Sequence, residues 1–386
     1  MKVLMVLGRS AGGIGAHVDT LVTGLRELGH DVQIVTADST AQTFGWPDAH
    51  RLWPVHHGSR APRGLVDWHR VMRLAGTVDV VHAHGHQAAV VAAVAVARAR
   101  PRPRLVVSLH NDLPPTSPSQ PSPSGPCRSN ASSSVARAQA AVARHLLAWS
   151  LRRADLVELA ESLGARRTEL ALVPSAAVVD LLASERLTPP ERDALLREAG
   201  VPTDRPLVLT VSRIAPQKDL PTLVEAARLS RVPATWLVVG DGDERLRARL
   251  EQDADGIRRR GGDGPVVRFV GARTDVGAWL RAADLFVLTS RWEARALVVQ
   301  EAMAAGLPVV VTRTGGLPDL VGDAGSLVAV RDPSAVSAEV DRLLTDREAR
   351  ARLGATARAV AGGWPTPDDE TRRWVDRYAT DASGMT

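Results

Sequence analysis

The sequence is short of several residue types, and each shortage excludes a class of protein. Its 386 residues include one cysteine, Cys127, so no disulfide can form within the chain, which indicates a reducing compartment. Aromatic residues make up 3% of the chain and form no stacking or zinc-finger pattern, so nucleic acid is not an expected partner. No apolar run approaches the roughly 20 residues of a membrane helix, and glycines rather than an export cleavage pattern follow the opening KVLMVLG. We therefore expect a cytoplasmic protein.

Lysine is scarcer than the overall charge suggests. Lys2 and Lys218 are the only two lysines, although the formal net charge is +5. Arginine supplies nearly all of the positive charge, so Lys218 is a candidate for a position that needs a compact ammonium group. The basic balance also favours acidic ligands, or weak peripheral contact with an anionic membrane at the inner face of the cell envelope.

What the chain does contain is typical of a soluble globular protein, with 45% apolar and 24% charged residues. Because a chain of this length is too long to fold around one hydrophobic core, two domains are expected. In the first half, apolar runs alternate with helical patterns, which predicts a parallel sheet covered on both faces. The expected strands are residues 2–8, 31–37, 78–84 and 104–110, with helices at 16–29 and 88–98.

The alternation restarts after a polar segment bracketed by prolines, and it predicts a second doubly wound sheet. Its six expected strands are residues 206–213, 235–242, 266–272, 284–290, 307–313 and 325–330. The expected divisions are an N-terminal domain at 1–182, a linker at 183–205, a C-terminal domain at 206–363 and a final helix at 364–386. Within the first domain, the proline- and serine-rich residues 114–134 predict a mobile loop, and residues 135–153 an arginine-bearing amphipathic helix.

A glycine-rich turn, Gly12-Gly13-Ile14-Gly15, follows the first strand. Such a turn lets backbone amides approach an anion at the start of a helix, where the helix dipole also favours negative charge. The spacing is not the dinucleotide fingerprint GxGxxG, and a plain tight turn is an equal alternative.

Arg213 and Lys218 lie just past an expected strand, on the side of an open sheet where ligands bind. Arginine offers a planar fork and lysine a point charge, so together they suit a diphosphate leaving group that gains negative charge. The alternative is a solvated loop that carries two unrelated charges.

Glu293 falls in the turn after another expected strand, and Glu301 lies about one turn into the following helix, which is expected to begin near Leu297. Both carboxylates can therefore line one pocket with the first amides of that helix. Carboxylates accept hydrogen bonds from paired hydroxyl groups, which sugars and ribose present. Taken alone, two surface charges would be the simpler interpretation.

Two further groups of residues invite a functional interpretation. His82, His84 and His86 alternate and would share one face of a strand, but no cysteine or carboxylate completes a metal site, so a metal is not expected. His86 is instead a candidate for contact with an acceptor. Three tryptophans could form a sugar platform, although single tryptophans are more often core residues: Trp46, Trp53 and Trp68.

Taken together, the motifs resemble a known family. They are the GGIG loop, His110 at the end of a strand in SLHND, Arg213 with Lys218, the blocks GDGDERLRARL and FVGARTDV, and the two glutamates. The combination extends over nearly the whole chain and is similar to retaining glycosyltransferase family 4, within the glycosyl transferases group 1. The resemblance implies an α/β fold of the GT-B type, in which two Rossmann-like, doubly wound parallel-sheet domains face each other across a cleft. It also implies that the last helix, from about Trp364, packs back on the first domain.

The resemblance further implies a role for each matching residue. Gly12 and Gly13 would bring amides to the donor diphosphate, and Arg213 with Lys218 would hold it from the other domain. Glu301 would bind the ribose hydroxyls.

Two catalytic residues are implied as well: Glu293 at the hydroxyls of the transferred sugar and His110 beside the bond that breaks. The amides of Arg295, Ala296, Leu297 and Val298 would meet phosphate or sugar. The loop from Val270 to Arg273 would face the base.

The expected function is transfer of a sugar from a nucleotide diphosphate sugar, UDP favoured and GDP as the alternative, to an unidentified hydroxyl acceptor with retention of configuration. Members of the family are similar in working without a bound metal, and no permanently bound cofactor is expected. The acceptor classes considered are small glycosides, natural products, lipids and envelope precursors. Three departures from the family pattern, at four residues, bear on which sugar is carried: Ala294-Arg295, Ser212 and Asp219.

Other activities stay open. One is a catalytically silent GT-B protein that binds a sugar nucleotide or a partner protein, and another is a different GT-B enzyme such as a sugar epimerase. A phosphorylase is disfavoured, because phosphorylases of this fold need a lysine for pyridoxal phosphate and only two lysines are present.

Overall fold

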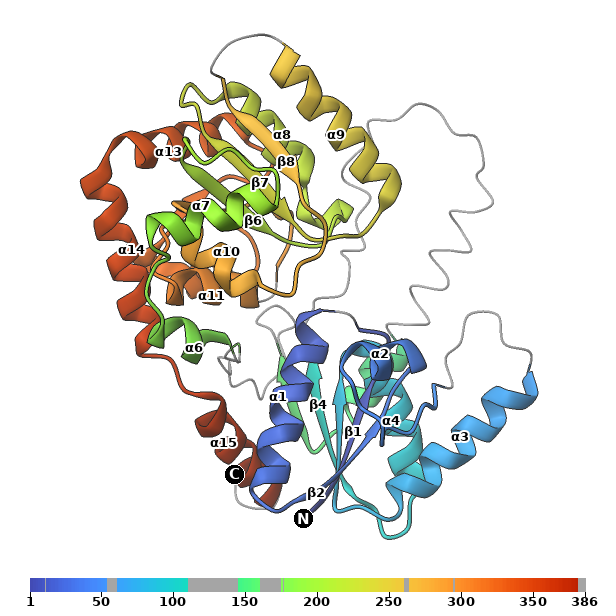
Figure 1. Cartoon of the computed structure of the whole chain (residues 1–386). Coiled ribbons are helices and arrows are strands. Elements are labelled where there is room, and N and C mark those ends of the chain that lie inside the picture. Colours follow the sequence, from blue (N-terminus) through green and yellow to red (C-terminus); the bar gives the residue numbers. More distant parts are fainter. Residues whose placement is uncertain are drawn as a thin grey trace. The chain divides into compact units, whose positions relative to one another are not determined.

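A computed structural model describes residues 1–10, 12–53, 61–109, 145–159, 175, 177–259, 264–293 and 296–380. The predicted loop at 114–134 and the first part of the predicted helix at 135–153 lie outside these residues. The chain, coloured along its sequence in Figure 1, separates into two compact units. One consists of Met1–Ala171 with Asp368–Thr386, and the other of Leu172–Pro367.

The first unit contains a parallel sheet of five strands in the order β2-β1-β3-β4-β5. Its four predicted strands are confirmed, and β5 is added at the edge. The strands are β1 Lys2–Leu7, β2 Asp31–Val35, β3 Val80–His84, β4 Arg104–Leu109 and β5 Leu156–Leu159. The sequence order turns back at β1, which has β2 on one side and β3 on the other, so the point of reversal lies at the carboxyl ends of β1 and β3.

Helices cover both faces of this sheet (Figure 1). The helices are α1 Gly13–Glu27, α2 Asp38–Thr43, α3 Ala61–Ala75, α4 His86–Arg98 and α15 Pro367–Ala379, and residues 145–151 are also helical. Alternate residues of β1 serve the two layers: Met5 packs with α1 and α15, whereas Leu4 and Val6 pack with α3 and α4. This burial on both faces explains why β1 is a continuous apolar run rather than an alternating one.

The C-terminal helix α15 belongs to the first unit although it ends the chain. Trp374 and Tyr378, one helical turn apart, are buried in the core with α1 and β1. The Tyr378 hydroxyl lies 2.7 Å from Nδ1 of His82, and Nε2 of His82 lies 2.8 Å from Oγ of Ser108. One apolar stripe and one buried polar chain therefore hold α15 to the sheet.

The second unit contains a parallel sheet of six strands in the order β11-β10-β9-β6-β7-β8. All six predicted strands are confirmed: β6 Leu207–Val211, β7 Thr235–Val239, β8 Val266–Phe269, β9 Leu285–Leu288, β10 Val309–Thr312 and β11 Ser326–Val328. From β6 the chain runs outward to β8 and then returns to β9 on the other side of β6. The point of reversal thus lies between β6 and β9, the place where open α/β sheets bind ligands.

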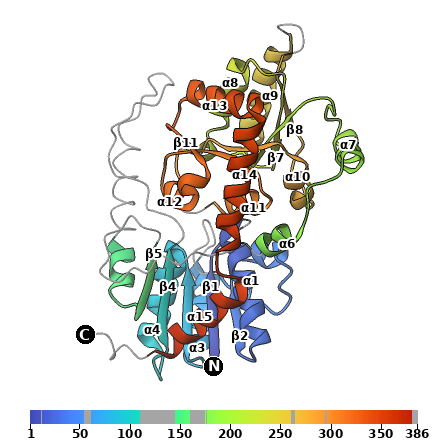
Figure 2. The same cartoon turned by 90° about the vertical axis from the view of Figure 1, so that its left-hand side faces the viewer.

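The helices of the second unit lie on both sides of its sheet (Figure 2). They are α6 Ala177–Ala183, α7 Pro189–Glu198, α8 Leu220–Leu229, α9 Glu244–Arg259, α10 Val276–Ala282, α11 Leu297–Ala304, α12 Leu317–Val321, α13 Pro333–Thr345 and α14 Arg347–Gly362, with short 3-10 turns at Pro216–Lys218 and Gly322–Ala324. α14 runs beside α11 in both views, and Arg358 of α14 donates to the Ala304 carbonyl at 2.8 Å.

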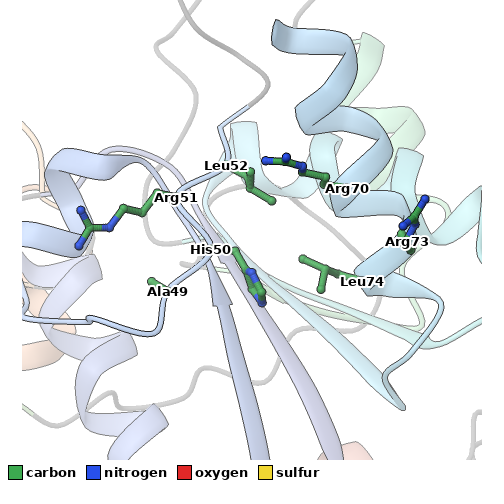
Figure 3. Close-up of a pocket in the computed structure, with 7 residues that line it drawn as sticks. All are labelled: Ala49, His50, Arg51, Leu52, Arg70, Arg73 and Leu74. Carbon is green, nitrogen blue, oxygen red and sulfur yellow. The ribbon is translucent and has the colours of Figure 1, made fainter.

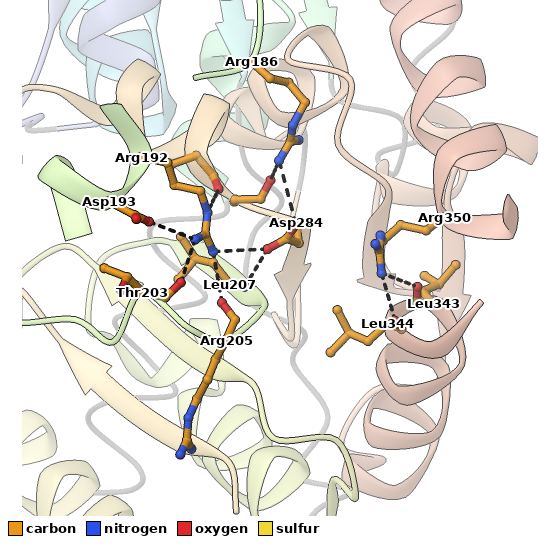
Figure 4. A network of polar contacts seen from close by, with 12 residues as sticks. Arg186, Arg192, Asp193, Thr203, Arg205, Leu207, Asp284, Leu343, Leu344 and Arg350 are labelled. Atoms are coloured by element: carbon orange, nitrogen blue, oxygen red, sulfur yellow. Dashed lines mark hydrogen bonds and ion pairs between the residues drawn. The ribbon is translucent and has the colours of Figure 1, made fainter. Parts of the chain in front are cut away.

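Residues 183–205, expected to form a linker, contain α7, which packs on the second unit. Leu196 is buried in its core. The Arg192 guanidinium donates to the Ala282 carbonyl at 3.1 Å and to the Arg205 carbonyl at 3.0 Å, and it lies 3.5 Å from the Asp284 carboxylate. Figure 4 shows Arg192 directed toward Arg205 and Asp284. Five guanidinium donors on one side chain can satisfy several loop carbonyls at once, and the segment is thereby fixed.

Candidate functional site

The strongest candidate site lies at the carboxyl ends of β6 and β9, where the strand order of the second unit reverses. The turn after β6 is packed tightly against the turn after β7. A Cβ atom on Gly242 would lie 2.2 Å from the Ile214 carbonyl oxygen, and one on Gly240 would lie 2.1 Å from that of Ser212. Only glycine permits the two turns to approach so closely. The contacts fix the backbone of Ser212 and Ile214, on either side of Arg213.

The turn after β6 is also bonded to the turn after β9. Gln217 Nε2 donates to the Trp292 carbonyl at 2.7 Å, and the Arg291 amide donates to the Gln217 carbonyl at 2.8 Å. The Arg291 guanidinium lies 3.0 Å from the Asp219 carboxylate, and Asp219 has a left-handed backbone with φ of +48°. A residue other than glycine keeps such a conformation only where its surroundings hold it there.

Lys218 and Glu293, one from each turn, form an ion pair through Nζ and Oε1. Their side chains are only 14% and 8% exposed. Ser290 Oγ donates to the same carboxylate oxygen at 2.6 Å. The backbone of Glu293 is fixed too, because Gly316 donates its amide to the Glu293 carbonyl at 3.0 Å.

Glu301 lies one turn into α11, as predicted, and its environment differs from that of Glu293. Its carboxylate accepts a hydrogen bond of 2.5 Å from Ser175 Oγ. Burial raises the pKa of Glu301, and the Ser175 hydrogen bond lowers it by a smaller amount. Ala296 caps α11 without a side-chain hydrogen bond, so the first amides, at Leu297 and Val298, have no acceptor within the helix.

The two predicted arginines that the structure describes differ in their surroundings. The side chain of Arg213 is exposed and makes no ion pair with any described residue. Arg273, in contrast, is held by Asp275 through two hydrogen bonds of 2.9 Å, and Glu198 lies 3.7 Å away. Its charge is therefore largely neutralised within its own loop. Arg295 lies outside the described residues.

In the first unit, Gly12 caps α1 and Gly13 is its first residue, so the helix begins three residues earlier than predicted. A Cβ on Gly12 would meet open space, whereas one on Gly15 would lie 2.1 Å from the Phe44 ring. Gly15 is thus needed for packing, and the open side of the turn is at Gly12. Ser10 Oγ accepts the Gly15 amide at 3.0 Å. The catalytic candidate His110 lies outside the described residues.

The three alternating histidines and the three tryptophans singled out in the sequence do not form a metal site or a sugar platform among the described residues. His82 and His84 lie on β3, but His86 begins α4, so the three do not share one strand face. Within the described part of the chain, no group of three His, Cys, Asp or Glu side chains could hold a metal ion. The tryptophans belong to the core: Trp46 and Trp53 are 4% and 2% exposed, and Trp68 packs against the same cluster as Trp53.

A cavity of about 520 Å³ lies in the first unit between the segment after α2 and α3 (Figure 3). Leu52 and Leu74 line it together with the basic residues His50, Arg51, Arg70 and Arg73. Arg51 points away from the cavity, and its guanidinium pairs with Asp38 at 2.9 Å. No predicted site residue lines this cavity.

Sequence patterns did not reveal the residues that hold the two glutamates. Ser175 and Ser290 are ordinary serines beside apolar runs, and Gly315 is one of 31 glycines. A Cβ on Gly315 would lie 1.7 Å from the Glu293 carbonyl oxygen. The position of Ser290 at the end of β9 was the one signal that could have drawn attention to it.

The chain resembles known glycosyltransferases in sequence. The chain matches the family Glycosyltransferase Family 4 over residues 11–195 and the family Glycosyl transferases group 1 over residues 191–360. It is 34% identical over 241 residues to the D-inositol 3-phosphate glycosyltransferase of Xylanimonas cellulosilytica, covering 59% of this chain and 55% of that protein. It is 32% identical to the lipopolysaccharide core biosynthesis glycosyltransferase LpsE of Rhizobium meliloti, covering 39% of this chain and 43% of that protein. The matches therefore span about half the length of these curated relatives.

Solved structures resemble the chain over nearly all of its length. Anabaena HepE in complex with UDP and glucose has a TM-score of 0.78 at 21% identity, covering 99% of this chain and 100% of HepE. WaaG, a glycosyltransferase of lipopolysaccharide biosynthesis, has a TM-score of 0.68 at 18% identity, covering 99% of this chain and 100% of WaaG. These similarities establish the fold, which is GT-B. The two family matches together extend from residue 11 to residue 360, and the chain belongs to the group 1, family 4 glycosyltransferases.

Proposed function

We propose that this protein transfers a sugar from a nucleotide diphosphate sugar, with UDP favoured, to a hydroxyl acceptor with retention of configuration. The observation that carries the proposal is the placement of Lys218, Glu293 and Glu301 around the strand-order reversal of the second sheet. Ligands bind at such reversals in open α/β sheets. UDP is favoured because Anabaena HepE, which has the same fold, was solved with UDP and with UDP-glucose.

In this proposal, Arg213 and Lys218 bind the diphosphate and stabilise the charge that it gains as the glycosidic bond breaks. Lys218 can serve both Glu293 and a phosphate, because an ammonium group has three donors and the ion pair uses one. The exposed Arg213 supplies the planar fork. Lys218 and Arg213 would together supply the positive charge that stabilises the diphosphate, so the proposed reaction needs no bound metal.

The carboxylates and amides would orient the rest of the donor. Glu301 would accept the ribose hydroxyls, and Glu293, whose Oε1 already bonds Lys218 and Ser290, would use its other oxygen for the transferred sugar. The Leu297 and Val298 amides would meet a phosphate or sugar oxygen at the start of α11.

We also propose roles for the remaining predicted residues. Gly12 and Gly13 would supply amides for the diphosphate, and His110 would act beside the anomeric carbon. For Arg295 we propose a contact with an anionic group on donor or acceptor. We keep the loop of Arg273 as the base-facing segment, with its backbone rather than its paired guanidinium as the contact.

Calorimetry with UDP, GDP, ADP and TDP, in the presence of a metal chelator, tests the donor. We expect UDP to bind most tightly and the chelator to have no effect. Release of UDP from UDP-glucose over a broad panel of acceptors then tests transfer. Binding without any turnover on that panel would favour the catalytically silent alternative.

The acceptor is proposed only by class: a small glycoside, a natural product, a lipid or an envelope precursor. LpsE, to which the chain is similar, is named for lipopolysaccharide core biosynthesis. Among the described residues, no helix is both long and apolar enough to span a membrane. Weak peripheral membrane contact is proposed through the expected helix at 135–153; in its described part, Leu146 is 46% exposed ahead of Arg152 and Arg153. Failure to sediment with anionic vesicles at low salt would remove this proposal.

A further inference from the structure

Ser175 makes hydrogen bonds to two consecutive side chains of α11. Its backbone amide donates to Gln300 Oε1 at 3.1 Å, and its hydroxyl donates to Glu301 Oε1 at 2.5 Å. Ser175 is 6% exposed and Gln300 is fully buried. Both contacts bridge more than a hundred residues of sequence, so they depend on the folded second unit.

The position of Ser175 is itself fixed. Its carbonyl accepts the Val178 amide at 3.0 Å, which ties it to the first turn of α6. The Gln300 bond restrains its amide from the other side. Its backbone is therefore fixed, and the hydrogen bond from its hydroxyl to Glu301 Oε1 favours one rotamer of that carboxylate.

The Ser175 hydroxyl is the only hydrogen-bond donor to the Glu301 carboxylate among the described residues. The bond is as short as charge-assisted O–H···O⁻ bonds are. Since it occupies Oε1 alone, Oε2 is left to accept a hydroxyl from a ligand.

We propose that Ser175 is a positioning residue, which holds the Glu301 carboxylate in the orientation that accepts the ribose hydroxyls of the donor. The proposal rests on the proposed function of Glu301. It extends the donor site to the segment just after the boundary between the two units, since the second unit begins at Leu172.

The test compares two ligands, UDP and 2′,3′-dideoxy-UDP, by calorimetry on three variants at one pH. For Ser175→Ala we expect UDP affinity to fall about tenfold to a hundredfold, because a hydrogen bond to a charged group is lost. The affinity for 2′,3′-dideoxy-UDP should stay unchanged, since it lacks both ribose hydroxyls. Ser175→Thr, which keeps the hydroxyl, should restore UDP affinity. Ser175→Cys, with similar size and a weak donor, should resemble Ser175→Ala.

A matched control is Ser184→Ala, which removes a serine hydroxyl at the end of α6 that donates to the Asp180 carbonyl at 2.6 Å. It should leave both affinities unchanged. Equal losses for UDP and dideoxy-UDP in Ser175→Ala, or no loss for either, would overturn the positioning role. If Ser175→Ala does not fold, the contrast between Ser175→Thr and Ser175→Cys decides in the same way.

Glu301→Ala separates this proposal from the proposed function. Full UDP affinity in Glu301→Ala would show that Glu301 is not the ribose ligand. Loss of UDP affinity in Glu301→Ala without loss in Ser175→Ala would leave the function standing and refute only the role of Ser175.

Discussion

Lys218 and Glu293 are 75 residues apart in the sequence and form an ion pair at the ends of the neighbouring strands β6 and β9. Both side chains are largely buried, at 14% and 8% exposed. Each charge offsets the cost of burying the other, so each residue has a structural partner as well as a proposed ligand.

The pair predicts non-additive stability changes. Lys218→Met and Glu293→Gln should each lower the free energy of unfolding, Lys218→Met by about 3–5 kcal/mol because it leaves a buried carboxylate uncompensated. The double variant should be more stable than the sum of the two losses predicts. Urea denaturation of the four proteins measures this. As a control, Arg228→Ala, which breaks an exposed ion pair with Glu225, should lower the free energy of unfolding by less than about 1 kcal/mol. Strict additivity of Lys218→Met and Glu293→Gln would contradict the prediction.

Glu301→Gln should stabilise the protein and weaken UDP binding. Burial raises the pKa of Glu301 above its ordinary value of 4.5, so the folded state holds this proton more tightly than the unfolded state. The contribution of Glu301 to stability is therefore full below the ordinary pKa and is lost as the pH rises through the raised pKa. Glutamine avoids that loss and can still accept the Ser175 hydrogen bond.

Thermal unfolding checks the pH dependence of Glu301→Gln. The gain in Tm should be larger at about pH 8 than at about pH 5, with each kcal/mol worth roughly 2–4 °C. Glu191→Gln is a matched control, because Glu191 is an exposed capping residue whose pKa is lowered by hydrogen bonds from Thr188. Glu191→Gln should not raise the Tm of the protein at either pH. A gain in Tm for Glu301→Gln that is larger at pH 5 than at pH 8 would contradict this prediction.

Gly315→Ala should disturb Glu293 through the backbone. Gly315 has φ of +52°, and a Cβ there would lie 1.7 Å from the Glu293 carbonyl oxygen. Gly322 has φ of +48° with open space around its Cβ, so Gly322→Ala introduces backbone strain without a steric contact. Gly315→Ala should cost more by urea denaturation and should also weaken UDP binding. Equal costs for the two variants would argue against a role for this contact.

Arg213→Ala should weaken diphosphate binding without loss of stability, because the exposed guanidinium makes no ion pair with a described residue. A charge-assisted hydrogen bond is worth about 1.5–3 kcal/mol, so UDP affinity should fall at least about tenfold while uridine affinity stays the same. Calorimetry with both ligands measures the difference. Arg231→Ala, a control at an exposed arginine before β7, should change neither affinity. An equal loss of uridine affinity in Arg213→Ala would show that Arg213 does not bind the diphosphate.

The candidate site was only partly predictable. Glu301 was expected one turn into a helix beginning near Leu297, and α11 begins at that residue. Arg213 and Lys218 were expected past a strand end, which β6 and its turn confirm. The pattern could not show that Arg273 is bound by Asp275, because both residues are polar in a loop and either could have faced a ligand.

By itself, the sequence determined the ten predicted strands and the two sheets, because apolar runs between helical patterns mark local segments that must be buried on both faces. The tertiary structure decided the order of the strands, and with it the contact of Lys218 with Glu293 and of Ser175 with Glu301. These contacts span 75 and 126 residues. Periodicity along the chain reports which residues are buried, whereas the partner of a buried polar group depends on which strands and helices become neighbours.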